Sequence, residues 1–163
     1  MVIAEMTPDD SAPVRALLQV AFGGAAEAEL VEVLVREANI VFAAIARDGP
    51  EPAGFIAFSR LMLEAAGGPF SAVALAPLAV APERRRQGIG AALVGFAHEQ
   101  LKARGEALSV VLGEPRYYRR FGYSTERAAR FESPYRAECL LALAFTDAPR
   151  QGRLVYPPAF AAL

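Results

Sequence analysis

The segment from Ala72 to Leu112 constrains the fold of this 163-residue chain more than any other part of the sequence. An apolar run ends at Val80, a loop that reads RRRQGIG follows, and apolar residues then recur at helical spacing as far as Leu101. A second apolar run, Leu108 to Leu112, closes the unit. A strand, a helix and a strand in this order form a right-handed crossover between two parallel strands. The sequence therefore predicts a parallel strand pair with a helix packed against it.

The rest of the chain predicts helices and antiparallel hairpins around this unit. Asp10 or Ser11 can cap a first helix, and the turn Arg47-Asp48-Gly49-Pro50 separates two β-like runs. The expected elements are a strand at 2–6, helices at 11–22 and 28–35, strands at 41–46, 53–63 and 70–80, a short helix at 114–121 and a strand at 139–145. No linker, repeat or low-complexity tract interrupts them. We expect an α/β (α+β) fold in one domain over residues 1–163.

Composition excludes several classes of function. The net charge of −1 gives no general attraction to nucleic acid or to an anionic membrane surface. No apolar run reaches the length of about 18 residues that a membrane span needs. A single cysteine, Cys139, rules out an internal disulfide framework and a cysteine-rich metal site, and we expect no bound metal. The N-terminus lacks the charge pattern of a signal peptide, so we expect a cytoplasmic protein.

The loop RRRQGIG can be interpreted in two ways from its residues alone. Gly88 and Gly90 let a ligand approach the backbone at the start of a helix, where free N–H groups and the helix dipole attract anions. An arginine-rich turn before a helix can equally be a solvated loop. The P-loop pattern G-x-x-x-x-G-K-[ST] is absent, and Leu93 stands where a dinucleotide fingerprint has its third glycine. Local chemistry thus leaves an anion site and a plain charged turn both open.

The wider segment LAPLAVAPERRRQGIGAALV, residues 75–94, resembles motif A of the GNAT N-acetyltransferase superfamily. Arg85, Gly88 and Gly90 fill the pattern [QR]-x-x-G-x-[GA], after a strand and before an amphipathic helix. The resemblance covers roughly residues 1–145, and ALAPLAV with VVLGEPRYYRRFGY is similar to a bacterial subfamily of predicted acetyltransferases. It implies the acyl-CoA N-acyltransferase fold, a mixed and mostly antiparallel sheet flanked by helices, whose parallel strands splay at motif A.

The resemblance also implies a site for acetyl-CoA as co-substrate. The strand before the loop is bulged in that family, so the backbone of Leu78, Ala79 and Val80 is expected to pair with the pantetheine arm. The N–H of Leu78 is expected to polarise the thioester carbonyl, and Pro77 agrees with a bulge. Arg85 is expected to line the pyrophosphate loop. The residues expected to bind the pyrophosphate through their N–H groups are Arg86, Gln87, Gly88, Ile89, Gly90 and Ala91.

The resemblance assigns the acid that protonates the departing thiolate to a tyrosine four residues before the glycine of a G-[FY] pair. That position is Tyr118, and Tyr117 leaves an ambiguity of one residue. A phenol with a pKa near its usual value of about 10 suits this role. The alternative is a tyrosine that only packs. The chain also departs from common relatives, because Gly113-Glu114-Pro115 stands where they carry an asparagine that contacts the cofactor.

The sequence names no general base with the same clarity. Glu29 and Glu64 are candidates, although surface carboxylates are the commoner explanation, and attack with proton loss through ordered water is the third option. His98 lies in the middle of the helix after motif A, where a packed or exposed ring is expected more than a catalytic one. Cys139 is expected to be a small buried hydrophobic residue on a strand.

The resemblance therefore implies transfer of an acetyl group from acetyl-CoA to a primary amine of a small molecule or peptide, through a tetrahedral intermediate. A non-catalytic acyl-CoA sensor and a nucleotide-phosphate-binding module are the rival hypotheses. We expect no nucleic acid and no membrane among the partners. The acceptor, the oligomeric state (a homodimer included) and the role of residues 146–163 stay open.

Overall fold

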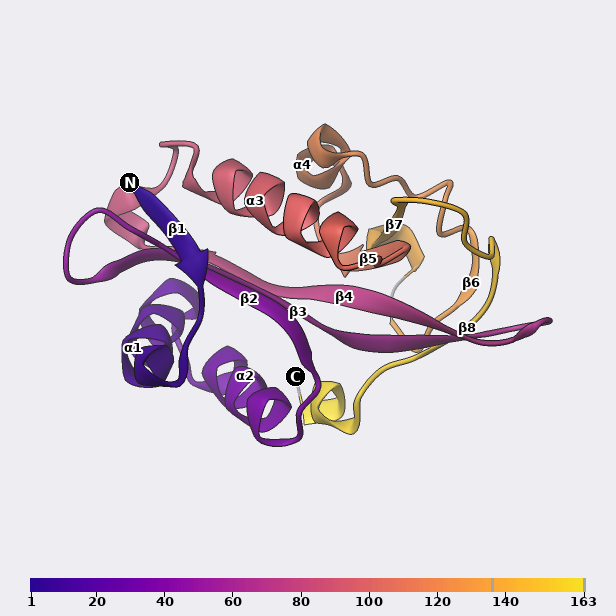
Figure 1. Cartoon of the computed structure of the whole chain (residues 1–163), viewed down its shortest axis with the longest axis horizontal. Coiled ribbons are helices and arrows are strands. Elements are labelled where there is room, and N and C mark those ends of the chain that lie inside the picture. Colours follow the sequence, from indigo (N-terminus) through magenta and orange to yellow (C-terminus); the bar gives the residue numbers. More distant parts are fainter. Residues whose placement is uncertain (136, 163) are drawn as a thin grey trace.

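The computed structural model describes residues 1–135 and 137–162, so Arg136 and Leu163 of the predicted domain lie outside the described residues. A twisted mixed sheet separates two layers of helices (Figure 1). The main strand order is β1-β2-β3-β4-β5-β7, and β8 pairs with both β3 and β6. The strands are β1 (Val2–Glu5), β2 (Ile40–Arg47), β3 (Pro52–Ala65), β4 (Gly68–Val80), β5 (Leu108–Leu112), β6 (Arg130–Glu132), β7 (Leu140–Ala144) and β8 (Gln151–Val155).

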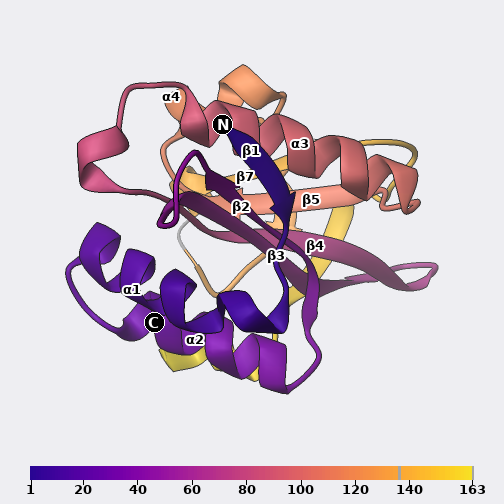
Figure 2. The same cartoon turned by 60° about the vertical axis from the view of Figure 1, so that its left-hand side comes forward.

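Two helices cover one face of the sheet and a third covers the other (Figures 1 and 2). The first pair is α1 (Ser11–Phe22) and α2 (Ala26–Arg36), and the opposite helix is α3 (Ile89–Ala103). Gly23 ends α1 at a φ of 74°, a left-handed conformation that costs glycine little. A short helix, α4 (Pro115–Tyr118), continues into a 3-10 turn, η3 (Arg119–Phe121), above the sheet. Further 3-10 turns are η1 (Pro8–Asp10), η2 (Pro82–Arg84), η4 (Ala137–Cys139) and η5 (Pro158–Ala162).

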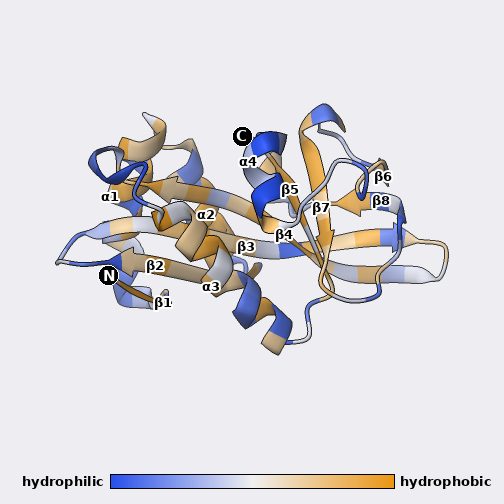
Figure 3. Cartoon of the chain, turned by 90° about the horizontal axis from the view of Figure 1, so that it is seen from above, coloured by the Kyte–Doolittle hydropathy of each residue, from blue (hydrophilic) through white to orange (hydrophobic). Residues whose placement is uncertain are grey.

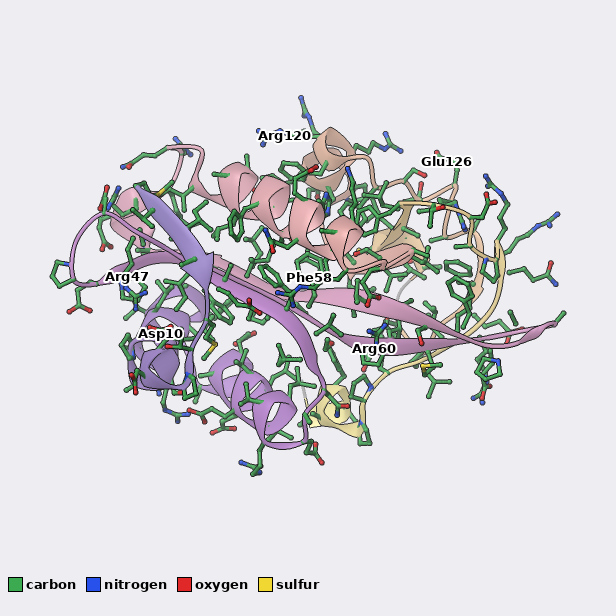
Figure 4. All side chains as sticks on the ribbon, viewed as in Figure 1. Asp10, Arg47, Phe58, Arg60, Arg120 and Glu126 are labelled. Carbon is green, nitrogen blue, oxygen red and sulfur yellow. The ribbon has the colours of Figure 1, made fainter. Side chains whose placement is uncertain are left out.

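The core follows the alternation of side chains along the strands. In β2, Phe42 and Ala44 pack against α3, whereas Ala43 and Ile45 pack against α1. Phe58 lies buried between the sheet and α3 (Figure 4). Both faces of the central strands are therefore covered, which explains their nearly continuous apolar sequence. Figure 3 colours the chain by hydropathy: the strands β5 and β7 are hydrophobic, whereas the helix α4 beside them is hydrophilic.

The predicted crossover is confirmed: β4 and β5 are parallel, and α3 connects them. They pair only over Val73–Leu75 of β4, and past Leu75 the two strands part. The predicted bulge is also present. Between the pairs Ile56–Leu78 and Phe58–Leu75, β4 advances by one residue more than β3, at the cis peptide Ala76–Pro77. The fold thus matches the mixed, mostly antiparallel sheet with one splayed parallel pair that the family resemblance implies.

Three local expectations need correction. The short strands β6 and β8 were not predicted, because each has few residues and only their mutual pairing and the edge of β3 stabilise them. Cys139 precedes β7 in η4 and is half-buried, because the last strand begins at Leu140 and not at 139. The expected helix at 114–121 is α-helical only to Tyr118.

Within the described residues, no helix has the length and apolarity required to cross a membrane.

Candidate active site

A pocket of about 540 Å³ lies where β4 ends, α3 begins and α4 crosses above. All but one of the residues predicted from the sequence to bind the cofactor line this pocket; the exception is Gln87. Tyr117, Arg84 and Arg120 also line it, as do two residues at the end of α1. The full lining is Ala21, Phe22, Leu78, Ala79, Val80, Arg84, Arg85, Arg86, Gly88, Ile89, Gly90, Ala91, Tyr117, Tyr118 and Arg120.

The loop before α3 leaves the start of that helix without a cap. Arg86 and Gly88 both have left-handed backbones, with φ values of 64° and 80°, and turn the chain into the helix. Gly88 is the N-cap residue and has no side chain that could accept a hydrogen bond. The first helical bond runs from the Ala92 N–H to the Gly88 carbonyl (3.0 Å), so the N–H groups of Ile89, Gly90 and Ala91 precede the hydrogen-bonded ladder. These donors, at the positive end of a four-turn helix, suit an anion.

Two of the three loop arginines hold the loop in place. Arg84 donates to both carboxylate oxygens of Asp48 (2.7 and 2.5 Å) and, through Nε, to the Gln87 side chain (3.1 Å). Hydrogen bonding from Arg84 lowers the pKa of Asp48, so this exposed pair stays charged at neutral pH. Arg85 donates to the Ala21 carbonyl at the end of α1 (3.2 Å). The contact with Arg84 turns the Gln87 side chain to the loop surface, which explains why it does not line the pocket.

The end of β4 presents a free edge to the pocket. Leu78, Ala79 and Val80 pair with β3 on one side. On the other side, β5 has already diverged after Leu75, so no strand of the described residues pairs there. The backbone groups of this stretch that point away from β3 are therefore available to a ligand. The bulge at Ala76–Pro77 directly precedes this free edge.

Tyr117 and Tyr118 form the wall opposite β4, and their rings meet edge to face at 5.1 Å. A Cβ added to Gly90 would lie 2.6 Å from the Tyr117 hydroxyl oxygen, so this tyrosine reaches the start of α3. The Tyr118 ring sits over Gly113, where a Cβ would lie 2.5 Å from its Cε2. Gly113 thus makes room for the Tyr118 ring.

The structure changes the expected acidity of Tyr118. Burial, with a smaller contribution from Tyr117, raises its pKa to about 12, above the usual value of about 10. Burial also raises the pKa of Tyr117, although Arg120 partly offsets this. The Arg120 guanidinium lies 5.3 Å from the centroid of the Tyr117 ring, on the outer side of η3 (Figure 4). Both phenols are therefore protonated hydrogen-bond donors throughout the neutral range.

The other sequence candidates lie elsewhere. Glu29 is exposed on α2, and Glu64 accepts two hydrogen bonds from Arg153 (2.9 and 2.5 Å) near the far end of β3. Neither lines the 540 Å³ pocket, and Cys139 does not line it either. The contributions of Ala21, Phe22 and Arg120 were missed, because only the packing of α1 and η3 beside the loop brings them there. Among the described residues, no group of three or more His, Cys, Asp or Glu side chains is placed to hold a metal ion.

His98 is a buried structural residue that does not line the pocket. Its side chain belongs to a polar chain inside the core: a hydrogen bond joins Nε2 to the Tyr123 hydroxyl (3.0 Å), which is also bonded to Ser109 (2.8 Å). Burial, with a smaller effect from Lys102, lowers the pKa of His98 to about 4, while Glu99 opposes the shift. The folded protein therefore holds this ring neutral.

We expect this histidine to make the folded state less stable at mildly acidic pH. Between the usual pKa of 6.5 and about 4, the unfolded chain binds a proton at His98 that the folded chain does not. The free energy of unfolding should therefore fall by about 2 kcal/mol from pH 8 to pH 5. Urea denaturation of the wild type and of His98→Gln at both pH values measures this. An equal pH dependence in the variant would contradict the assignment.

Comparison with known proteins places this geometry in a family. The family model described as the acetyltransferase (GNAT) domain matches residues 2–125. The uncharacterized N-acetyltransferase YhbS of Escherichia coli K12 is 35% identical over 124 residues, which cover 76% of this chain and 73% of that protein.

Two solved structures have the same fold as this chain over nearly its whole length. The crystal structure of E. coli YhbS in complex with CoA has a TM-score of 0.90 and 28% identity, and the match covers 98% of this chain and 91% of that one. A GNAT family acetyltransferase from Brucella melitensis in complex with acetyl-CoA has a TM-score of 0.83 and 29% identity, with 98% and 97% covered. Together with the motif A loop and the splayed strands, these matches show that the chain belongs to the GNAT acetyltransferase family.

Proposed function

We propose that this protein is a cytoplasmic bacterial enzyme that transfers an acetyl group from acetyl-CoA to a primary amine of a small molecule or peptide. One observation carries the proposal: a single pocket of about 540 Å³ combines the uncapped start of α3, the loop arginines, the free edge of β4 and two protonated tyrosines. Two structural relatives were solved with CoA and acetyl-CoA, which supports the same ligand for this chain.

The residues present fit acetyl-CoA part by part. The N–H groups of Ile89 to Ala91 and the helix dipole would hold the pyrophosphate, and Arg86 would add charge at the pocket wall. The free edge of β4 at Leu78–Val80 would pair with the amide groups of the pantetheine arm, as one strand pairs with another. Gly90 is required because a side chain there would occupy the space between Tyr117 and the helix start.

Two groups of this chain would act at the reacting end. The Leu78 N–H would donate to the carbonyl oxygen of the thioester and stabilise the negative charge that it gains when the amine attacks. Tyr118 would donate to the sulfur as the carbon–sulfur bond breaks. Because the pKa of Tyr118 is about 12, this phenol is a weaker acid than a thiol of pKa about 8.5. Tyr118 would therefore stabilise the thiolate by a hydrogen bond. The proton that the amine loses accounts for the proton of the thiol product.

None of the described residues that line the pocket carries a carboxylate that could act as a general base. With Glu64 paired to Arg153 and Glu29 exposed, we propose that the proton of the attacking amine leaves through water. The rate would then come from orienting the amine and the thioester in one site and from stabilising the oxyanion.

Two rival functions predict different ligands or no turnover. An acyl-CoA sensor would bind acetyl-CoA without transferring its acetyl group, and a nucleotide-phosphate module would prefer ATP or NAD. Thermal shift with acetyl-CoA, CoA, ATP and NAD separates the ligands, since a ligand that binds only the folded state raises the melting temperature. We expect a shift with the two coenzyme A forms alone. A mixed set of amines is then tested for release of free thiol, and thiol release without an amine is the blank. A shift with acetyl-CoA but no amine-dependent thiol would favour the sensor.

A further inference from the structure

The direction in which the Tyr118 hydroxyl points depends on the rings around it. Within the described residues, this hydroxyl makes no hydrogen bond. Its ring meets three other rings edge to face, at centroid distances of 5.1 Å to Tyr117, 6.4 Å to Phe121 and 5.9 Å to Tyr123. The ring also rests on Gly113. Packing therefore sets the orientation of the group that would donate to the sulfur.

Tyr123 is the ring among these three that side-chain hydrogen bonds hold in place. It is 1% exposed, and its hydroxyl is bonded to Nε2 of His98 (3.0 Å) and to Oγ of Ser109 (2.8 Å). Tyr117 and Phe121 are only half-buried, and the side chain of neither makes a hydrogen bond within the described residues. Tyr123 is therefore the fixed wall of this cluster of rings.

The hydrogen bonds join Tyr123 to two elements on which the 540 Å³ pocket depends. His98 lies on α3, which begins at that pocket, and Ser109 lies on β5, whose divergence from β4 leaves the free strand edge. The imidazole itself packs against the rings of Phe58 (6.3 Å) and Phe145 (5.1 Å). Tyr123 therefore keeps a fixed position relative to the helix start and the strand edge that are proposed to hold the coenzyme.

The hydroxyl of Tyr123 costs free energy that a phenylalanine would not, and it adds direction. Burying a phenol, an imidazole and a serine hydroxyl removes each of them from water, and their mutual hydrogen bonds must offset that cost. Phenylalanine would fill the same space without it. Two hydrogen bonds of 3.0 and 2.8 Å, however, restrict the ring to one position, because their strength falls steeply with distance and angle. The polar chain thus fixes geometry where packing alone would leave the ring some freedom.

We propose that Tyr123, held by His98 and Ser109, is a positioning residue that aims the Tyr118 hydroxyl at the sulfur of the coenzyme. This inference rests on the proposed role of Tyr118 and goes beyond it, because it assigns the residues that orient the donor. The edge-to-face contact carries the effect, since a shift of the Tyr123 ring lets the Tyr118 ring follow. A catalytic group displaced by about 1 Å can lose about a hundredfold in rate.

A double-mutant cycle tests whether Tyr123 acts through Tyr118. We expect Tyr123→Phe to lower kcat for amine-dependent thiol release about tenfold while the Kd of acetyl-CoA stays within about threefold. The affinity is spared because Tyr123 is not among the described residues that line the pocket. In a Tyr118→Phe background, Tyr123→Phe should change kcat less than about twofold, because no hydroxyl is left to aim. Equal losses in both backgrounds would overturn the inference.

Ser109→Ala is the milder variant and keeps the test decisive if Tyr123→Phe does not fold. Ser109 lies four residues before Gly113, about 13 Å at the rise of a strand, so its effect on Tyr118 has to pass through Tyr123. We expect kcat to fall about threefold in this variant. Leu63→Val, in the separate core under α2, is the matched control: it should lower the melting temperature and leave kcat unchanged. An equal fall of kcat in Leu63→Val would show general loosening and overturn the inference.

A spectroscopic measurement on the CoA-bound protein needs no turnover. Ring signals of ¹³C-labelled tyrosine report the surroundings of Tyr118, and Tyr118→Phe assigns its signal by removing it. We expect this signal to shift or broaden in Ser109→Ala and to stay in place in Leu63→Val. An unmoved signal in Ser109→Ala would overturn the inference even if no amine were turned over.

The outcomes separate this inference from the proposed function. A full kcat in Tyr118→Phe would remove the proposed role of Tyr118, and the inference with it. A large loss in Tyr118→Phe beside an unchanged kcat in Tyr123→Phe and Ser109→Ala would overturn the inference alone and leave acetyl transfer intact.

Discussion

Gly90→Glu is expected to abolish acetyl-CoA binding. The new carboxylate would stand at the first turn of α3, inside the pocket that the pyrophosphate is proposed to fill, and its Cβ would press on the Tyr117 hydroxyl oxygen at 2.6 Å. Like charges about 5 Å apart near a protein surface repel by about 3 kcal/mol, which corresponds to at least a hundredfold rise in Kd. Calorimetric titration with acetyl-CoA measures the change. A Kd within about threefold of the wild type would remove this loop as the pyrophosphate site.

The helix provides its own control for this substitution. Gly95 lies on α3 as well, is exposed, and has open space around an added Cβ, so Gly95→Glu should leave binding unchanged. Gly90→Gln has similar bulk without the charge and should fall between the wild type and Gly90→Glu. A negative charge near a helix N-terminus favours the helix, so charge alone should not unfold the variant. Melting curves of both glutamate variants separate lost binding from lost structure.

Tyr118→Phe is expected to lower kcat by about a hundredfold or more while the Kd of acetyl-CoA stays within about threefold. Phenylalanine keeps the ring over Gly113 and the edge-to-face contacts with Tyr117 and Tyr123, so only the hydroxyl that would hydrogen-bond the thiolate is lost. Steady-state thiol release and direct titration give the two quantities. An unchanged kcat would make Tyr118 a packing residue.

Tyr117→Phe is the matched control, because the neighbouring hydroxyl also lines the pocket but reaches toward Gly90. We expect it to change kcat by less than about threefold. If Tyr117→Phe alone caused the large loss, the donor would be Tyr117. The pH profile gives a second check. With a pKa of about 12, Tyr118 stays protonated, so its deprotonation should not reduce activity up to about pH 10.

Patterns that lie close together in the sequence predicted most of the fold. The crossover through α3, the hairpin strands and the bulge near Pro77 depend on periodicity, turns and a proline within short segments, and all are present. The strands β6 and β8 depend on pairing with each other and with β3 across long sequence separations. Such pairing leaves little local pattern, because three to five residues are too few to show one.

The same distinction applies to the candidate site. A contiguous stretch, Arg85 to Ala91, is proposed to supply nearly all the donors for the pyrophosphate, and its resemblance to motif A identifies it in the sequence. Gln87 does not line the pocket, because its side chain contacts Arg84 when the loop closes, and the expected contact of its backbone N–H stays a prediction. Phe22 and Arg120 reach the pocket only through packing between distant elements.

The sequence by itself determined the elements on which the proposed coenzyme site rests: a glycine loop between a strand and a helix, whose resemblance to motif A identified it. Tertiary structure alone decided the rest. It buried Tyr118 and raised its pKa, held His98 neutral in the core, and left Glu29 and Glu64 outside the 540 Å³ pocket. It also brought Tyr135, Tyr156 and Phe160 to the gap between β4 and β5. Burial and the meeting of remote side chains depend on how the layers pack, and no local pattern records them.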